Sequence, residues 1–141
     1  MIFREKVVVL TGAGSGIGRA LALQFAEEGA RLALSDINRS AVDETLQMVG
    51  ELTGPEQTAR AYTLDAASRE AVFAHAEEVQ RDFGTAHYVI NNAGATVFGT
   101  VEHTSIDEYA WQIGITMWGV LSGTTAFMPM ILAHRQGWLV N

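Results

Sequence analysis

The chain has 141 residues, of which 48% are hydrophobic and 18% charged, a balance that is ordinary for one soluble α/β domain. Sixteen acidic and nine basic residues give a net charge of −7, which repels phosphate backbones and anionic lipid headgroups and so disfavours nucleic-acid and membrane partners. The chain contains no cysteine, which excludes disulfides and thiolate metal sites within it.

Short apolar runs alternate with segments of helical periodicity along the chain. The runs predict strands at Lys6–Thr11, Ala30–Ser35, Ala59–Leu64, His87–Asn91 and Trp138–Asn141. The periodic segments predict helices at Ile17–Glu28, Arg39–Leu52 and Ser68–Phe83, which end at Gly29, Thr53-Gly54-Pro55 and Gly84. A long fourth helix, capped by Asp107, follows the loop Gly94–Ser105.

This alternation predicts a Rossmann-like, doubly wound parallel sheet with helices on both faces. Residues 1–141 are expected to form a single domain in which the fold stops at strand five. In such sheets ligands bind at the carboxyl ends of the strands, so the residues that follow each strand are the first candidates for a site.

Two stretches bear on targeting. The apolar run Val7–Leu10 is too short for a signal-peptide core, which predicts a cytoplasmic protein. Ala110–Ala133 contains no charged residue and is long enough to span a membrane. Because Gln112, Pro129 and several glycines and hydroxyl residues dilute its apolarity, a helix buried between the sheet and a partner subunit is favoured over a membrane span.

A glycine-rich loop lies between the first strand and the first helix. Its spacing is G-x-x-x-G-x-G through Gly12, Gly16 and Gly18, whereas a strict G-x-G-x-x-G fails because Ile17 stands three residues after Gly14. A helix N-terminus at this position offers unpaired amides to an anion, and glycines let the backbone approach a pyrophosphate closely.

Asp36 stands at the end of the second strand, where a carboxylate can accept both hydroxyls of an adenosine ribose. The same charge repels a ribose 2′-phosphate, so NAD is favoured over NADP. Arg39 opposes this preference, because its guanidinium could pair with that phosphate. The alternative role for Asp36 is that of a helix N-cap or turn residue.

One rival class fits the loop alone. Gly12-x-Gly14-x-Gly16 also satisfies the G-x-G-x-G loop of methyltransferases that use S-adenosylmethionine. Those enzymes usually carry an acidic residue two positions before the first glycine. Leu10 occupies that position here, which counts against them.

Four motifs in order along the chain resemble the short-chain dehydrogenase/reductase family. They are the loop Thr11–Gly18, the acidic turn Leu64-Asp65-Ala66-Ala67, the sequence Asn91-Asn92-Ala93-Gly94, and Gly137-Trp138-Leu139-Val140-Asn141. The resemblance covers the whole chain. It implies hydride transfer between NAD and a small alcohol or carbonyl substrate.

The resemblance also implies a role for each matching residue. The pyrophosphate and nicotinamide ribose would lie against Gly12, Ser15, Gly16, Ile17 and Gly18. The adenosine ribose would contact Asp36 and Ile37, the adenine would contact Asp65 and Ala66, and Asn92, Ala93 and Gly94 would run alongside the cofactor. Asn91 would tie the fourth strand to its neighbours, although Asn91-Asn92 also fits a polar turn at a strand end.

The chain departs from the family pattern in two places. Thr116 stands where the family has an asparagine that orders a water, and its shorter side chain fits equally well a threonine bonded to a carbonyl of its own helix. The family's serine and Tyr-x-x-x-Lys do not occur in the chain, because Tyr62, Tyr88 and Tyr109 all lack a lysine four residues on. The catalytic residues are therefore expected beyond Asn141, and a dinucleotide-binding module without turnover remains an alternative.

Other side chains have less specific interpretations. The histidines His75, His87, His103 and His134 lack ligand spacing, so no metal site is expected and solvated or capping roles are favoured. The loop residues Val97, Phe98, Thr100 and His103 are candidates for a substrate pocket or for ordinary loop packing. The fourth-helix aromatics Tyr109, Trp111, Trp118 and Phe127 are assigned to the core or to a subunit interface, since family members commonly pair through this helix as homo-oligomers.

Overall fold

The protein forms one parallel five-stranded sheet. The computed structural model describes residues 2–54, 58–134 and 137–141. The strands are β1 (Val7–Thr11), β2 (Arg31–Asp36), β3 (Ala59–Thr63), β4 (Tyr88–Ile90) and β5 (Trp138–Val140). They lie in the order β3-β2-β1-β4-β5, and every adjacent pair is parallel. The predicted Rossmann-like architecture is therefore confirmed.

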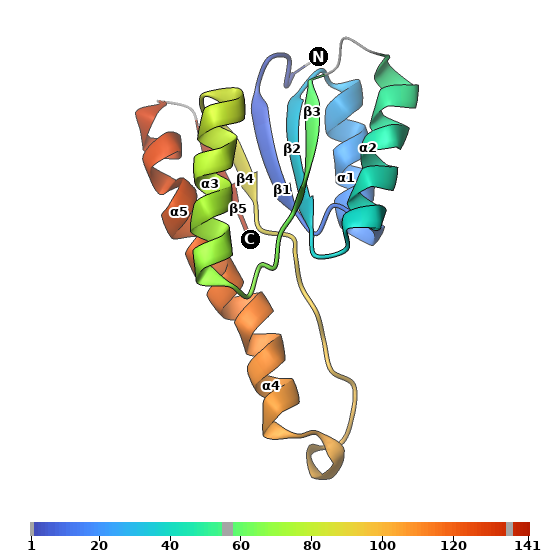
Figure 1. Ribbon diagram of the computed structural model, residues 1–141, viewed down its shortest axis with the longest axis vertical. Coiled ribbons are helices and arrows are strands. Elements are labelled where there is room, and N and C mark those ends of the chain that lie inside the picture. Colours follow the sequence, from blue (N-terminus) through green and yellow to red (C-terminus); the bar gives the residue numbers. More distant parts are fainter. Residues whose placement is uncertain (1, 55–57, 135–136) are drawn as a thin grey trace.

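Helices cover both faces of the sheet (Figure 1). Helices α1 (Gly16–Glu27) and α2 (Arg39–Thr53) lie on one face, and α3 (Arg69–Phe83) and α5 (Gly119–Ala133) lie on the other. The strand order reverses direction between β1 and β4. At such a switch point the connections leave to opposite faces and open a crevice at the carboxyl ends of the strands.

The central strand β1 supplies residues to both halves of the core. Its four apolar residues alternate in direction and are all buried, as expected of a strand with helices on both sides. Val7 and Val9 pack in the cluster that contains Phe127 of α5, whereas Val8 and Leu10 pack in the cluster toward α1 and α2. The Val-rich run thus anchors the strand whose end carries the glycine loop.

Polar caps fix the ends of two helices. The side chains of Asn38 and Ser68 accept hydrogen bonds from the third residues of α2 and α3, and Gly54 and Gly84 follow the last residues of the same helices. These ends agree with the predicted stops, except that Pro55 of the predicted breaker lies outside the described residues.

The predicted fourth helix begins and continues differently from expectation. Its cap is Ser105 and not Asp107: the Ser105 hydroxyl accepts the Glu108 N–H, and the Glu108 carboxylate accepts the Ser105 N–H at 2.7 Å. Helix α4 (Ile106–Ile113) passes into a π-helical segment η2 (Gly114–Trp118) before α5 begins. With the 3-10 turn η1 (Val101–His103) and its loop, α4 forms an arm that projects beyond the sheet (Figure 1).

Among the described residues, the continuous helix Ile106–Ala133 is the one helix long and apolar enough to cross a membrane, with a mean hydropathy of 1.4. Length and composition are weak evidence, because core helices of soluble proteins pass the same test. The buried residues of α5 recur every fourth position, at Gly119, Gly123, Phe127 and Ile131. This stripe packs α5 against α3 and the sheet as a layer of the fold.

Candidate functional site

The glycine loop after β1 is shaped by close backbone approaches. Gly12 has a φ of +68°, which an L side chain rarely adopts, and a Cβ there would lie 2.9 Å from the Cα of Ala93. A Cβ on Gly18 would collide with the carbonyl oxygen of Gly12 and lie 2.7 Å from the Asn92 side chain. Glycine at these two positions lets α1 start directly against the end of β4.

Asp36 connects this loop to the end of β2. Its Oδ2 accepts the backbone N–H of Gly14 at 2.9 Å, and its Oδ1 accepts the N–H of Asn38 at 2.9 Å. The cap of α2 is Asn38, so the interpretation of Asp36 as the helix N-cap is wrong. The bond from the Asn38 N–H to Asp36 Oδ1 is an Asx turn, so the interpretation of Asp36 as a turn residue is confirmed. Each carboxylate oxygen has a further lone pair, so both can still accept a hydroxyl from the cavity.

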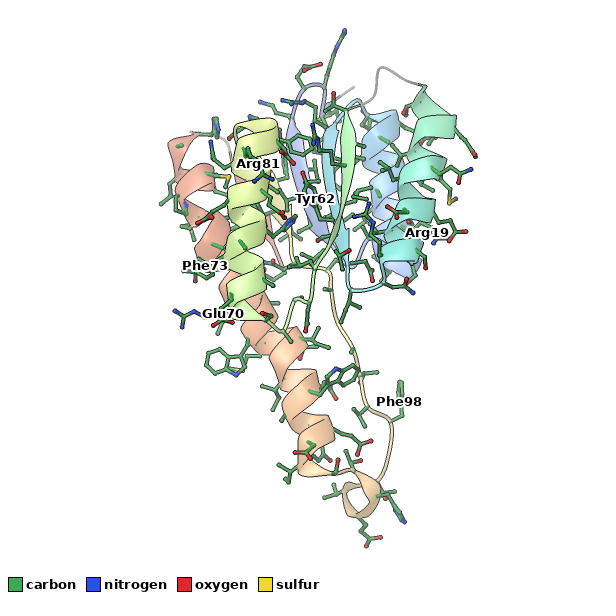
Figure 2. All side chains as sticks on the ribbon, viewed as in Figure 1. Arg19, Tyr62, Glu70, Phe73, Arg81 and Phe98 are labelled. Carbon is green, nitrogen blue, oxygen red and sulfur yellow. The ribbon has the colours of Figure 1, made fainter. Side chains whose placement is uncertain are left out.

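Polar side chains from both α1 and α2 bind the carbonyl groups of the loop: Arg19, labelled in Figure 2, comes from α1, and Thr45 comes from α2. Arg19 donates to the Gly14 carbonyl at 2.6 Å and to the Glu44 carboxylate at 2.6 Å. Thr45, which is fully buried, donates to the Ala13 carbonyl at 2.9 Å. The first turn of α1 has no side-chain cap from Ser15 and no acidic residue. Its N–H groups therefore favour an anion.

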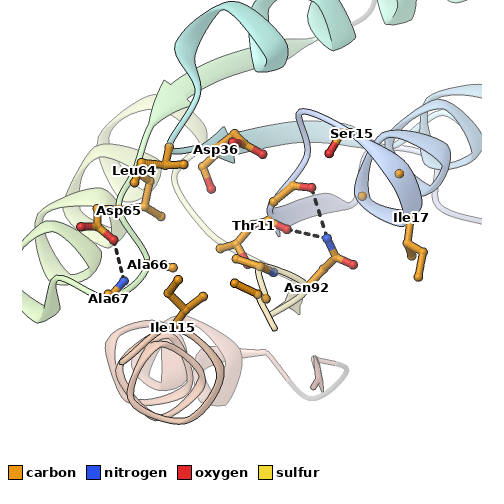
Figure 3. Close-up of a pocket in the computed structure, with 18 of the residues that line it drawn as sticks. Thr11, Ser15, Ile17, Asp36, Leu64, Asp65, Ala66, Ala67, Asn92 and Ile115 are labelled. Atoms are coloured by element: carbon orange, nitrogen blue, oxygen red, sulfur yellow. Dashed lines mark hydrogen bonds between the residues drawn. The ribbon is translucent and has the colours of Figure 1, made fainter. Parts of the chain in front are cut away.

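The end of β4 closes the opposite side of the site. The Asn92 amide donates to the carbonyls of Thr11 at 3.0 Å and Gly12 at 3.2 Å (Figure 3), and the Ala93 N–H donates to the Thr11 hydroxyl at 3.0 Å. The Asn91 amide instead donates to Asn141 at 2.7 Å. Asn91 therefore ties β4 to the chain beyond β5, as expected, and Asn92 ties it to the glycine loop.

The acidic turn Leu64–Ala67 after β3 forms a third border of the site, beside the glycine loop and the end of β4. Asp65 is exposed and its Oδ1 accepts the N–H of Ala67 at 2.9 Å, which leaves the second carboxylate oxygen available (Figure 3). The turn packs against the continuous helix Ile106–Ala133, called the fourth-helix segment below. A Cβ on Gly119, the first residue of α5, would lie 2.8 Å from the Ala66 carbonyl oxygen. The turn and the helix thus form one continuous wall.

These elements surround a cavity of about 460 Å³ at the carboxyl end of the sheet (Figure 3). All twelve residues predicted to contact the cofactor line it: Gly12, Ser15, Gly16, Ile17, Gly18, Asp36, Ile37, Asp65, Ala66, Asn92, Ala93 and Gly94. The other lining residues, for which no cofactor contact is predicted from the sequence, are Thr11, Ser35, Leu64, Ala67, Ala95, Trp111 and Ile115. The cavity is large enough for a substantial part of a dinucleotide.

Trp111 was assigned to the core or a subunit interface, and the structure places it on the cavity wall with 53% of its surface exposed. Ile115, four residues later, lines the same wall, and this helical spacing was the signal available in the sequence. Phe127 is buried in the core as expected, whereas Tyr109 and Trp118 are exposed and lie outside the core.

Other candidates do not reach the cavity. The hydroxyl of Thr116 is exposed and donates to the Gln112 carbonyl at 2.7 Å. This is the bond to a carbonyl of its own helix that the sequence offers as the alternative role of Thr116. The loop candidates Val97, Phe98, Thr100 and His103 are absent from the cavity lining. Phe98 is 92% exposed and lies on the projecting arm (Figure 2), so the substrate-pocket interpretation of this loop finds no support.

The histidines do not all have the predicted solvated or capping roles. His75 is only 2% exposed, packs edge-on against Tyr62, and its ring nitrogens have no hydrogen-bond partner. This burial lowers the pKa of His75 to about 4. His87 accepts the Val7 N–H at 3.0 Å and stacks on His134. Within the described part of the chain no group of three or more His, Asp or Glu side chains is placed to hold a metal ion.

Comparison with known proteins gives one consistent family. The model of the short chain dehydrogenase family matches residues 6–141. A putative oxidoreductase, SadH of Mycobacterium tuberculosis, is 45% identical over 139 residues, which are 99% of this chain and 49% of that protein. These matches do not support the methyltransferase that the G-x-G-x-G spacing left open.

Solved structures of the same family superpose closely. The NAD⁺-bound xylitol dehydrogenase has a TM-score of 0.92 at 36% identity, over 100% of this chain and 54% of that one. A short chain dehydrogenase/reductase from Burkholderia phymatum, in complex with NAD, has a TM-score of 0.87 at 32% identity, over 94% of this chain and 46% of that one. The chain spans about half the length of these relatives.

Proposed function

Because the chain belongs to the short-chain dehydrogenase family, we propose that it binds NAD and supplies the cofactor half of an oxidoreductase acting on a small alcohol or carbonyl substrate. The observation that carries this proposal is that one cavity is lined by all twelve residues predicted to contact the cofactor. When bound, the nicotinamide supplies or accepts the hydride. The residues of this chain bind and orient the dinucleotide.

Each part of NAD has a matching group in the cavity. The uncapped first turn of α1 favours the pyrophosphate, because its amides and the helix dipole attract negative charge. Asp36 accepts the hydroxyls of the adenosine ribose, and the free oxygen of Asp65 accepts the adenine amino group. The Ala93–Gly94 segment lies alongside the cofactor where Asn92 holds it against the glycine loop.

Two charges bear on the choice between NAD and NADP. Asp36 already accepts two backbone N–H groups and lines the cavity, where it repels a 2′-phosphate. Arg39, which could pair with that phosphate, donates to Asp43 at 2.8 Å, which raises the pKa of Arg39. Asp36 lines the cavity and Arg39 does not, so we propose Asp36 as the main determinant.

Turnover needs groups outside this sequence. We assign the family's serine and Tyr-x-x-x-Lys to sequence beyond Asn141. The Thr116 hydroxyl donates within its own helix, so as the counterpart of the family's asparagine it could only accept a hydrogen bond from a water. The second candidate function, dinucleotide binding without turnover, is favoured by the same lack of a Tyr-x-x-x-Lys.

The exposed apolar side chains of the fourth-helix segment, among them Trp118 and Leu121, are proposed as the contact between two copies of the protein. The net charge of −7 supports the proposal that the protein has no nucleic-acid partner and no membrane partner, and we propose a cytoplasmic location.

A titration tests the proposal directly. NADH fluorescence should rise as the protein is added, NADPH should bind more weakly, and S-adenosylmethionine should give no heat in calorimetry. Adding NAD and an alcohol to the chain alone should produce no NADH. Absence of NADH binding would remove the cofactor assignment, and turnover by the chain alone would remove the assignment of the catalytic groups to other sequence.

A further inference from the structure

The cavity wall formed by the fourth-helix segment contains an aromatic side chain that no motif accounts for. Trp111 is the one aromatic residue among the described residues that line the cavity. It precedes Ile115 by four residues, so the two side chains lie on the same face of the helix. An indole that is 53% exposed at a cavity has apolar surface left to bury.

This helix face closes over the acidic turn after β3. A Cβ on Gly114, between Trp111 and Ile115 in the sequence, would lie 3.5 Å from the Cβ of Ala67. The turn carries Asp65, whose free carboxylate oxygen is the group proposed for the adenine amino nitrogen. The wall that holds Trp111 therefore borders the adenine end of the cavity.

The loop after β4 is bonded to the helix that carries Trp111. The Val97 N–H donates to the Gln112 side chain at 3.1 Å, so the loop and α4 are bonded immediately next to Trp111. Ala95, two residues before Val97, lines the same cavity. The indole is thus carried on a helix that is fixed to two separate cavity walls.

We infer that Trp111 is the surface on which the adenine base of the dinucleotide stacks, with Asp65 accepting from its amino group. This inference rests on the proposed function. Stacking a base on an aromatic ring buries apolar area on both, and its loss on substitution by alanine weakens binding roughly 5- to 100-fold. Trp111 acts on the adenosine half alone, so nicotinamide mononucleotide should not depend on it.

Calorimetry on the 141-residue chain, with ADP-ribose and nicotinamide mononucleotide as separate ligands, tests whether Trp111 contributes to binding the adenosine half of the dinucleotide alone. Trp111→Ala should weaken ADP-ribose and NAD by the same factor, in the range of roughly 5- to 100-fold, and Trp111→Phe should restore most of the affinity. Trp138→Ala is the control, since Trp138 is also a tryptophan, is 60% exposed and does not line the cavity. It should bind ADP-ribose like the unaltered chain.

A second measurement does not require a variant at Trp111. In the double variant Trp118→Phe and Trp138→Phe, the remaining indole is Trp111, and ADP-ribose should change its fluorescence. Unchanged ADP-ribose affinity in Trp111→Ala, with or without an altered sedimentation coefficient, would overturn the inference and leave NAD binding intact. Failure of the unaltered chain to bind NADH at all would instead overturn the proposed function and this inference with it.

Discussion

The backbone N–H of Gly14 donates to the Oδ2 of Asp36 at 2.9 Å, which joins the middle of the glycine loop to the end of β2. The approach is close because Gly14 has no side chain: a Cβ would lie 2.8 Å from that same oxygen and 2.9 Å from the Cβ of Ala41. The position of the carboxylate and the shape of the loop are therefore set by one contact.

Gly14→Ala should break this contact. The added methyl overlaps Asp36 and Ala41, so we expect a loss of about 1–3 kcal/mol in the free energy of unfolding, and weaker NADH binding because Asp36 moves. Gly50→Ala is the control, since a Cβ there meets open space on α2 and should stabilise the protein by about 0.5–1 kcal/mol. Urea unfolding of both variants measures these changes, and equal stabilities would contradict the overlap.

Asp36→Asn should narrow the preference for NADH over NADPH by roughly tenfold, because the charge that repels the 2′-phosphate is lost. The amide oxygen can still accept the Gly14 N–H, but the amide nitrogen cannot accept the Asn38 N–H, so that second bond is lost with the charge. Adding Arg39→Ala to this variant should weaken NADPH only if Arg39 leaves Asp43 for the 2′-phosphate. Dissociation constants of both cofactors for the unaltered chain, Asp36→Asn and the double variant decide this. A preference that survives Asp36→Asn unchanged would assign the discrimination to another group.

Asn92→Asp should destabilise the protein more than Asn92→Ala. Alanine removes two hydrogen bonds of about 1 kcal/mol each, whereas aspartate also places negative charge against the carbonyls of Thr11 and Gly12. Asn38→Asp is the matched substitution, because either side chain can cap α2, and its effect should stay within about 0.5 kcal/mol. Thermal unfolding monitored by circular dichroism ranks the three. If Asp and Ala at position 92 prove equivalent, the amide does not donate as described.

His75 should make stability depend on pH. Its pKa is lowered by burial from the ordinary 6.5 to about 4, so the unfolded chain takes up the proton first as the pH falls. The stabilisation is complete above pH 6.5 and is lost progressively down to about pH 4. At pH 5 the loss is about 2 kcal/mol relative to neutral pH.

His75→Leu removes this titration and the two ring nitrogens that lack partners. The variant should be at least as stable as the unaltered chain at pH 7.5, and the difference between them should widen on acidification. Other groups, including His87, titrate in both proteins and cancel in the comparison. Parallel unfolding curves at pH 7.5 and pH 5 are the measurement, and a constant difference would refute a buried neutral His75.

Much of the fold follows from local patterns in the sequence. The Val-rich run at β1 and the alternation of strands and helices are enough to predict a parallel sheet. A continuous apolar run indicates a strand that is buried on both faces, and helical periodicity indicates a helix that is buried on one face. The start of α4 was misplaced because Asp107 and Ser105 both suit a helix N-terminus. The Ser105-x-x-Glu108 pairing, which decides between them, is a two-residue signal.

Some residues of the candidate site could also be predicted from local patterns in the sequence, and others could not. Motif residues after the strands, such as Gly12 and Asp36, could be predicted because the ends of parallel strands always meet at one edge. Trp111 could not, since a helical residue faces core, cavity or solvent according to where its helix docks. The burial of His75 was missed because its polarity gives no local sign that Tyr62 and Phe127 surround it.

The bond from Asn92 to the Thr11 carbonyl joins residues 81 positions apart. Contacts of such sequence separation require a large loop to close and form slowly during folding. The dinucleotide cavity is therefore incomplete until β4 docks beside β1, even if the first two strands and helices associate early. A nucleotide that binds only the docked state stabilises the fold by an amount that grows with the logarithm of its concentration above its dissociation constant, so cofactor supply would set the fraction of the chain that is folded.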